Sequence, residues 1–385
     1  MLKKFLSVIA IGCAFGCAFL ACDNGSAAPP PAEPIPSSDS QSQVVPVDYT
    51  LGRIMNTRLG RGINLGNSWD SRGSSDKGWG NPIRDTDFAV IKAAGFNSVR
   101  IPVQWHQDAD KTTHTVNPNR LAGVIEDIQL AMANGLAVVV NFHHYSDLNC
   151  AGGGGEGCKY NATKFQEEKA HFVAMWANLA ATLNAAFPAD DMLVLEILNE
   201  PIIPNATLVD QLMNEAYTVI RAAAPGKTIM FEAYHAAKFG DLGKLHLPPD
   251  GNIIFSGHYY EPYKYTHQGA HGYECVGDKA KINTAKNDMK KYVNDAQTLY
   301  PDINGVDHVP MNMGEFGVAG GTPFGCNGTP PTDAGKAEWV KLTAEAAVAN
   351  GISFHYWGFG KTGGFDAYQV DAEQWYPGFP EALIF

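Results

Sequence analysis

Eight short runs of apolar residues alternate along the chain with stretches in which apolar residues recur at helical spacing. The apolar runs show little polar alternation, which is typical of parallel strands buried on both faces. The helical stretches stop at glycines such as Gly95, Gly135 and Gly351, as many helices do. The runs cover residues 62–65, 98–103, 136–142, 193–198, 228–231, 252–256, 309–313 and 352–356.

This alternation predicts the fold. Repeated strand–helix units form a parallel sheet, and eight of them predict a closed (β/α)8 TIM barrel. An open doubly wound sheet is the alternative, but it normally has a glycine-rich phosphate turn after its first strand. Residues 62–67, Gly-Ile-Asn-Leu-Gly-Asn, do not supply that turn. We therefore expect residues 48–385 to form a single catalytic domain.

Polar residues follow the predicted strands where chemistry is expected. The carboxyl ends of the strands in such a barrel meet at one rim, which carries the active site. Glu200 and Glu315 each follow an apolar run, and paired carboxylates are the groups that cleave glycosidic bonds. Other side chains expected at this rim are Arg100, His143, His144, Asn199, His258, Tyr260 and Trp357.

The sequence resembles glycoside hydrolase family 5, the family of many cellulases. The matching segments are spread in the family's order over nearly the whole domain: residues 61–67, 95–102, 195–201, 258–260, 314–317 and 356–357. Residues 79–82, Trp-Gly-Asn-Pro, are similar to endoglucanase-rich branches that also include xyloglucan-active members.

The resemblance implies a retaining mechanism with Glu315 as nucleophile and Glu200 as general acid and base. Arg100 and Tyr260 are then expected to keep Glu315 ionised, while the nearby negative charge raises the pKa of Glu200. His258 would orient Glu200. The expected sugar contacts are Asn199 to the 2-hydroxyl, His143 and His144 to another hydroxyl, and Trp357 as an apolar floor.

Further substrate contacts are expected from Asn67, Trp79 and Trp105. For Trp79, Trp105 and Trp69, burial in the core is an equally good interpretation. Glu196 points to the other side of its strand from Glu200, and we interpret it as a structural residue paired with a buried donor.

We expect no metal and no cofactor. His143 and His144 with Asp147 could be metal ligands instead, but no His-x-His spacing occurs here. The loop at 152–155, Gly-Gly-Gly-Gly, is not a phosphate loop because Cys158 stands where lysine is required.

The N-terminal segment predicts export. Lys3 and Lys4 precede an apolar stretch, so residues 1–22 are expected to be a signal peptide, with a lipobox ending at Cys22. An ordinary cleaved signal is the alternative. Residues 23–47 are rich in proline and serine and predict a linker. We expect an exported monomer, either a lipoprotein at the cell surface or facing the periplasm, or a secreted protein. It would meet a membrane only through this anchor.

Charge and cysteines agree with export. A net charge of −12 and a pI near 5.4 argue against a nucleic-acid partner. The domain has four cysteines, Cys150, Cys158, Cys275 and Cys326, which an oxidising compartment would pair. We expect Cys150–Cys158 and Cys275–Cys326, although the sequence allows three connectivities.

The leading function is an endo-β-1,4-glucanase whose partner is a β-glucan polysaccharide. A β-mannanase or xyloglucanase of the same family is the first alternative. A non-catalytic glycan-binding surface lipoprotein is another, although a binder does not need both glutamates. A zinc hydrolase on the same barrel would be indicated by bound zinc and by inhibition with a chelator.

Overall fold

The computed structural model describes residues 44–72, 75–188, 192–270, 273–320, 326 and 328–385. Residues 44–385 form one compact unit. The predicted signal peptide and most of the predicted linker lie outside the described residues. Among the residues described, no helix combines the length and the apolar character that crossing a membrane requires.

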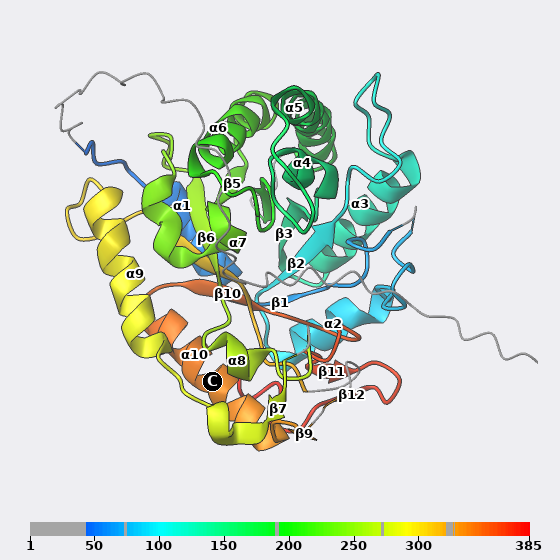
Figure 1. The fold of residues 1–385 in the computed structure, drawn as a ribbon, viewed down its shortest axis with the longest axis vertical. Helices are drawn as coiled ribbons and strands as arrows, with labels where there is room; N and C mark the ends of the chain where they lie inside the picture. The colour runs from blue at the N-terminus through cyan, green and yellow to red at the C-terminus, as the bar shows by residue number, and fades with distance from the viewer. Residues whose placement is uncertain (1–43, 73–74, 189–191, 271–272, 321–325, 327) are drawn as a thin grey trace, which may run out of the picture. The chain divides into compact units, whose positions relative to one another are not determined.

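Eight parallel strands close into a barrel in the order β1-β10-β8-β6-β5-β4-β3-β2, which confirms the predicted fold class (Figure 1). Two further pairs of two-residue strands, β7 with β9 and β11 with β12, lie in the loops. The barrel strands are β1 (Arg61–Asn64), β2 (Ser98–Val103), β3 (Ala137–Phe142), β4 (Leu193–Glu196), β5 (Thr228–Glu232), β6 (Ile253–Tyr259), β8 (Met311–Phe316) and β10 (Ser353–Tyr356). The loop strands are β7 (Cys275–Val276), β9 (Gly328–Thr329), β11 (Tyr368–Gln369) and β12 (Gln374–Trp375).

Helices surround the barrel in Figure 1, and local sequence explains where they begin. The side chains of Asn117, Asn161, Asn205 and Thr332 accept backbone N–H groups in the first turns of α3, α5, α6 and α10. The helices are α1 (Thr50–Leu59), α2 (Asp85–Ala94), α3 (Pro118–Ala133), α4 (Ser146–Ala151), α5 (Ala162–Ala186), α6 (Ala206–Ala223), α7 (Tyr234–Ala237), α8 (Tyr263–Thr266), α9 (Ala285–Leu299), α10 (Asp333–Ala349), and the 3₁₀ helices η1 (Phe239–Lys244) and η2 (Gly277–Ala280).

The barrel interior is apolar at one end and charged at the other. Val194, Met230 and Ile254 form a small buried cluster with residues of α1, which closes the amino-terminal end. Side chains two residues apart on a strand point to the same face. The next inward positions on these strands are therefore Glu196, Glu232 and Ser256, all fully buried. Period-two alternation thus sets a polar layer directly above the apolar one.

Candidate active site

Glu200 and Glu315 face each other at the carboxyl end of the barrel. Glu315 lies within β8, and Glu200 lies four residues beyond the end of β4. Nδ1 of His258 is 2.8 Å from Oε1 of Glu200 and 3.7 Å from Oε2 of Glu315. A carboxylate oxygen of each glutamate lies within 4.8 Å of the other. This spacing suits a retaining glycosidase, whose carboxyl groups are about 5–5.5 Å apart, whereas inverting enzymes need about 6.5–9.5 Å.

Arg100 fixes the nucleophile side of the site. Its side chain is fully buried and donates five hydrogen bonds, one for each N–H of the guanidinium. Two go to Glu196 at 2.7 and 2.8 Å, which confirms that Glu196 pairs with a buried donor. The expectation that Glu196 points away from the site was wrong, because it points into the barrel and shares Arg100 with Glu315. One goes to Oε1 of Glu315 at 2.9 Å, and Tyr260 donates to the other oxygen at 3.1 Å. The remaining two reach Asn64 and Asn199.

Glu232 belongs to this cluster, and the sequence analysis missed it. It is the last residue of β5 and is fully buried. Oε2 of Glu232 accepts the backbone N–H of Glu200 at 2.7 Å, and Oε1 lies 3.0 Å from Nε2 of His258. The signal was present in the sequence, because an acid directly follows the apolar run 228–231. Asn64, the other missed residue, carries no such signal.

The pKa values of the two glutamates move opposite to the sequence-based expectation. Burial raises the pKa of Glu315, although the charges of His258 and Arg100 oppose it. Removal from bulk water also favours a higher pKa for Glu200, but the hydrogen bond and charge of His258 outweigh it and lower that pKa. Burial disfavours the charged form of His258, yet Glu315 and Glu232 hold its pKa well above the ordinary value. The expectation counted only the negative charge beside Glu200, and it was wrong because His258 is positive.

The expected sugar contacts line the space beside the glutamates. The rings of His143 and Trp357 are parallel, 3° between planes and 5.9 Å between centroids. His144 is exposed and packs edge-on against His143. Oδ1 of Asn199 accepts from Arg100, while its buried Nδ2 finds no acceptor among the described residues. That N–H is available to a ligand hydroxyl.

Three other predicted contacts have different surroundings. Trp105 is fully buried and donates from Nε1 to the backbone oxygen of Asn141 at 2.8 Å, so it is a core residue and the prediction of a sugar contact was wrong. Trp69 is also buried, with Nε1 on Asp127. Asn67 donates from its side chain to the backbone oxygen of Lys361, which ties two loops together. Trp79 is 39% exposed, so its face is accessible to a polymer.

Asp70 joins His143 and His144 in a group whose ligand atoms lie within 4.8 Å of one another. Asp147, the residue expected to complete a metal site, is not part of this group. Both oxygens of Asp70 accept backbone N–H groups, from Asn67 at 3.1 Å and from Ser68 at 2.7 Å. These contacts explain the position of Asp70 as an organiser of the loop after β1.

Disulfides hold two loops next to the site. Cys150–Cys158 follows β3, and Cys275–Cys326 joins the segments after β6 and β8, which confirms the expected pairing.

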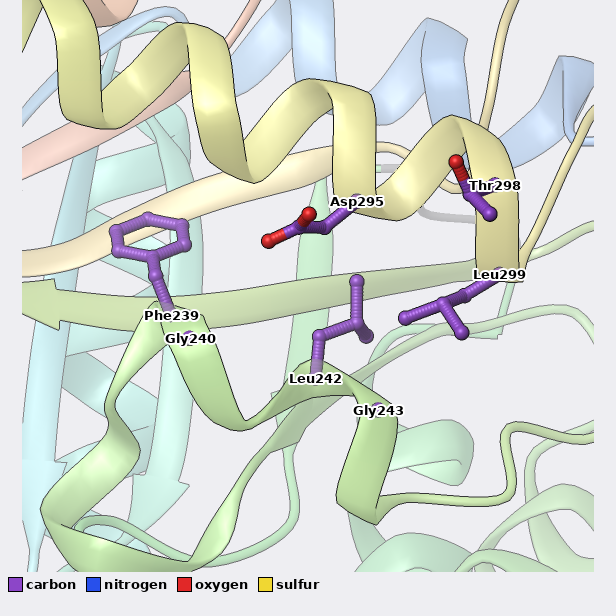
Figure 2. Close-up of a pocket in the computed structure, with 7 residues that line it drawn as sticks. All are labelled: Phe239, Gly240, Leu242, Gly243, Asp295, Thr298 and Leu299. Atoms are coloured by element: carbon purple, nitrogen blue, oxygen red, sulfur yellow. The ribbon is translucent and has the colours of Figure 1, made fainter.

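A separate groove lies between η1 and α9 (Figure 2), lined from η1 by Phe239 and Leu242 and from α9 by Asp295, Thr298 and Leu299. It shares no residue with the predicted site.

The closed barrel and its two facing glutamates define a class, the (β/α)8 barrels with a two-carboxylate site at the carboxyl ends of the strands. A sequence model of Cellulase (glycosyl hydrolase family 5) matches residues 61–363. The chain therefore belongs to glycosyl hydrolase family 5.

Similar proteins agree with this assignment. Endoglucanase H of Acetivibrio thermocellus is 24% identical over 334 residues, which is 86% of this chain and 32% of that protein. Cellodextrinase A of Ruminococcus flavefaciens is 28% identical over 216 residues, 54% of this chain and 61% of that protein. The chain thus spans less than two thirds of either relative. The structure of Thermotoga maritima Cel5A in complex with mannotriose superposes with a TM-score of 0.72 at 28% identity, covering 86% of this chain and 100% of that one.

Proposed function

We propose that the protein is a retaining endo-β-1,4-glucanase that cleaves β-1,4-glucan chains by double displacement. The observation that carries the proposal is the spacing of Glu200 and Glu315, whose nearest oxygens lie within 4.8 Å. That distance leaves a sugar carbon within reach of one carboxylate and the glycosidic oxygen within reach of the other. Family membership and the endoglucanase relatives support the substrate class.

The first displacement uses both glutamates. An oxygen of ionised Glu315 attacks the anomeric carbon, the glycosidic C–O bond breaks, and the proton of Glu200 passes to the leaving oxygen. The two glutamates titrate as a coupled pair, and the reactive form is the one in which Glu200 carries a proton and Glu315 is ionised. The N–H of Asn199 that has no acceptor among the described residues donates to the sugar 2-hydroxyl, while Trp357 stacks under the ring.

The second displacement releases the sugar. Once Glu315 is esterified its negative charge is gone, and the positive charges of His258 and Arg100 lower the pKa of Glu200 further. Glu200 then takes a proton from water as the oxygen of that water attacks the anomeric carbon and frees Glu315.

The test is the viscosity of a soluble cellulose derivative after addition of the full chain. Wild type should reduce the viscosity rapidly, because internal cleavage shortens the polymer before much sugar is released. Glu315→Gln should abolish the effect. Glu338→Gln, at an exposed position on α10 that pairs with Lys281, is the matched control and should behave as wild type. Full activity in Glu315→Gln would refute the mechanism.

A mannan backbone is the second candidate, because the similar Thermotoga maritima Cel5A structure is a complex with mannotriose as substrate. The same viscosity assay with soluble mannan and with soluble xyloglucan shows which polysaccharide backbone the enzyme cleaves. Activity on mannan alone would keep the mechanism and replace the substrate.

We also propose that the chain is an exported lipoprotein, which the basic start, the apolar stretch and Ala21-Cys22 support. Cells given a clickable palmitate analogue should label the wild-type chain but not Cys22→Ala. Equal labelling of both would remove the lipid anchor from the proposal.

A further inference from the structure

Glu232 is a buried acid that the two-carboxylate mechanism does not use. Its side chain is 0% exposed at the end of β5. It touches both the general acid and the imidazole beside that acid: Oε2 accepts the backbone N–H of Glu200, and Oε1 lies 3.0 Å from Nε2 of His258.

The contact between Glu232 and His258 determines whether Nδ1, the imidazole nitrogen that faces Glu200, carries a hydrogen. Oε1 of Glu232 and Nε2 of His258 make no hydrogen bond of standard geometry with any described residue, so their 3.0 Å approach is an ion-pair contact. Nδ1 of His258 lies 2.8 Å from Oε1 of Glu200. A proton between Glu232 and Nε2 can sit on either atom, and in both arrangements Nδ1 carries a hydrogen that Glu200 accepts.

The contact with the backbone holds Glu200 in place. Glu200 has a φ of 44°, in the left-handed region that non-glycine residues rarely adopt. Such a conformation persists where its surroundings enforce it. The hydrogen bond from its N–H to Glu232 is 2.7 Å long and buried on the acceptor side, so it stabilises this conformation directly.

We propose that Glu232 is the positioning residue of the general acid. It holds the backbone of Glu200 and keeps a hydrogen on Nδ1 of His258, so that Glu200 accepts on Oε1 and presents Oε2 to the leaving oxygen. This inference rests on the proposed role of Glu200 as acid and base.

The other groups facing Glu232 set the conditions of the test. Arg100 lies on β2 with Nη2 3.6 Å from Oε1, and Glu196 faces Glu232 from β4. Burial raises the pKa of Glu232 to about 8, with His258 opposing and Glu196 adding to the rise. Near neutral pH a carboxamide therefore matches the protonated form of Glu232 in shape and charge. Glutamine can accept from the backbone of Glu200 and donate to Nε2 of a neutral His258, whose hydrogen is then on Nδ1.

The experiment compares two substrates whose leaving groups differ in how strongly they require protonation by the general acid. Phenyl β-cellobioside requires protonation of its leaving oxygen, whereas 2,4-dinitrophenolate leaves without it. In Glu232→Leu, kcat/KM for the phenyl substrate should fall about 100-fold and that for the dinitrophenyl substrate less than about tenfold. Glu232→Asp cannot reach both contacts and should show the same selectivity in smaller measure if the leucine variant does not fold. Glu232→Gln should restore both substrates.

Glu168→Leu is the matched control, because Glu168 is a buried acid on α5, bound to Tyr145 and Lys111. It should change both substrates by the same factor. Equal losses on both substrates in the leucine and aspartate variants, or a glutamine variant as defective as leucine, would overturn the positioning role. An inactive wild type would instead refute the proposed function.

An NMR measurement that needs no turnover distinguishes failure of the positioning role from failure of the proposed function. In protein labelled with ¹⁵N-histidine, the His258 signal is assigned by its loss in His258→Gln. Its Nδ1–H should be present in wild type and Glu232→Gln and lost in the leucine and aspartate variants. An unchanged Nδ1–H in both of those variants contradicts the inference, whatever the enzyme's activity.

Discussion

Gly66→Ala should disable the Trp357 face of the site while leaving both glutamates untouched. A Cβ at Gly66 would lie 2.5 Å from Cη2 and 2.7 Å from Cζ2 of Trp357. Ordinary contacts begin at 3.4 Å, so the indole must retreat by 0.9 Å (3.4 − 2.5). The indole is rigid and stacks against His143, with 5.9 Å between ring centroids, so the displacement reaches the second sugar contact as well.

The size of the effect follows from that displacement. A misplacement of about 1 Å in a positioning group costs on the order of 100-fold in rate. We therefore expect kcat/KM on an aryl β-cellobioside to fall about 100-fold, and the free energy of unfolding to fall by about 1–3 kcal/mol from overpacking. Steady-state kinetics and urea denaturation followed by tryptophan fluorescence measure both.

Gly226→Ala is the control, because a Cβ there would meet nothing within 4 Å. It should match wild type in both assays. A Gly66→Ala variant with kcat/KM within about threefold of wild type would show that the position of Trp357 does not limit catalysis, and would refute the reasoning.

Three further predictions test other parts of the molecule. Arg100→Lys offers three donors in place of five and leaves part of Glu196 unpaired, so urea denaturation should show a loss of about 3–5 kcal/mol; an unchanged midpoint would contradict this. Burial raises the pKa of Asp127 to about 7, so the folded protein binds more protons than the unfolded chain between about pH 4 and pH 7 and loses stability as pH rises, by at most about 1.4 kcal/mol per unit. Asp127→Asn, which keeps an acceptor for Trp69, should remove that slope in urea denaturation, and parallel pH curves would contradict it. Trp79→Ala should raise KM on polysaccharide without changing stability, and an unchanged KM would leave Trp79 outside the substrate surface.

The sequence predicted those parts of the site that a strand end and a local motif mark together. Glu200, Glu315 and His258 all follow or end apolar strands, so the barrel rule alone brings them to one rim. Trp105 also follows a strand, but its burial depends on how the loop after β2 packs onto Asn141, which periodicity does not encode. Glu232 ends its strand as the others do, yet it sits in no motif.

The directions of the pKa shifts could not be predicted from the sequence, because each depends on a neighbouring charge that itself depends on further neighbours. Glu200 responds to the charge of His258, and His258 responds to Glu315 and Glu232 at once. Whether the imidazole lies 2.8 Å or 6 Å from a carboxylate decides the sign, since an opposite charge acts strongly only within about 4–6 Å. Such distances come from the closed barrel and not from spacing along the chain.

Arg100 explains why so many acids can be buried together. Glu196 and Glu315 lie 2.7 and 2.9 Å from the guanidinium, and an isolated buried carboxylate would instead take up a proton. Glu232 lies farther away, at 3.6 Å, and burial raises its pKa to about 8. Because every N–H of Arg100 is used, its plane is fixed, and the positions of Glu315 and Asn199 are fixed with it. The second cation, His258, is held by acids on both nitrogens and contacts both catalytic glutamates. The two cations thus have different roles. Arg100 holds the nucleophile Glu315 in a fixed orientation, while the charge of His258, which depends on its protonation, sets the pKa of Glu200.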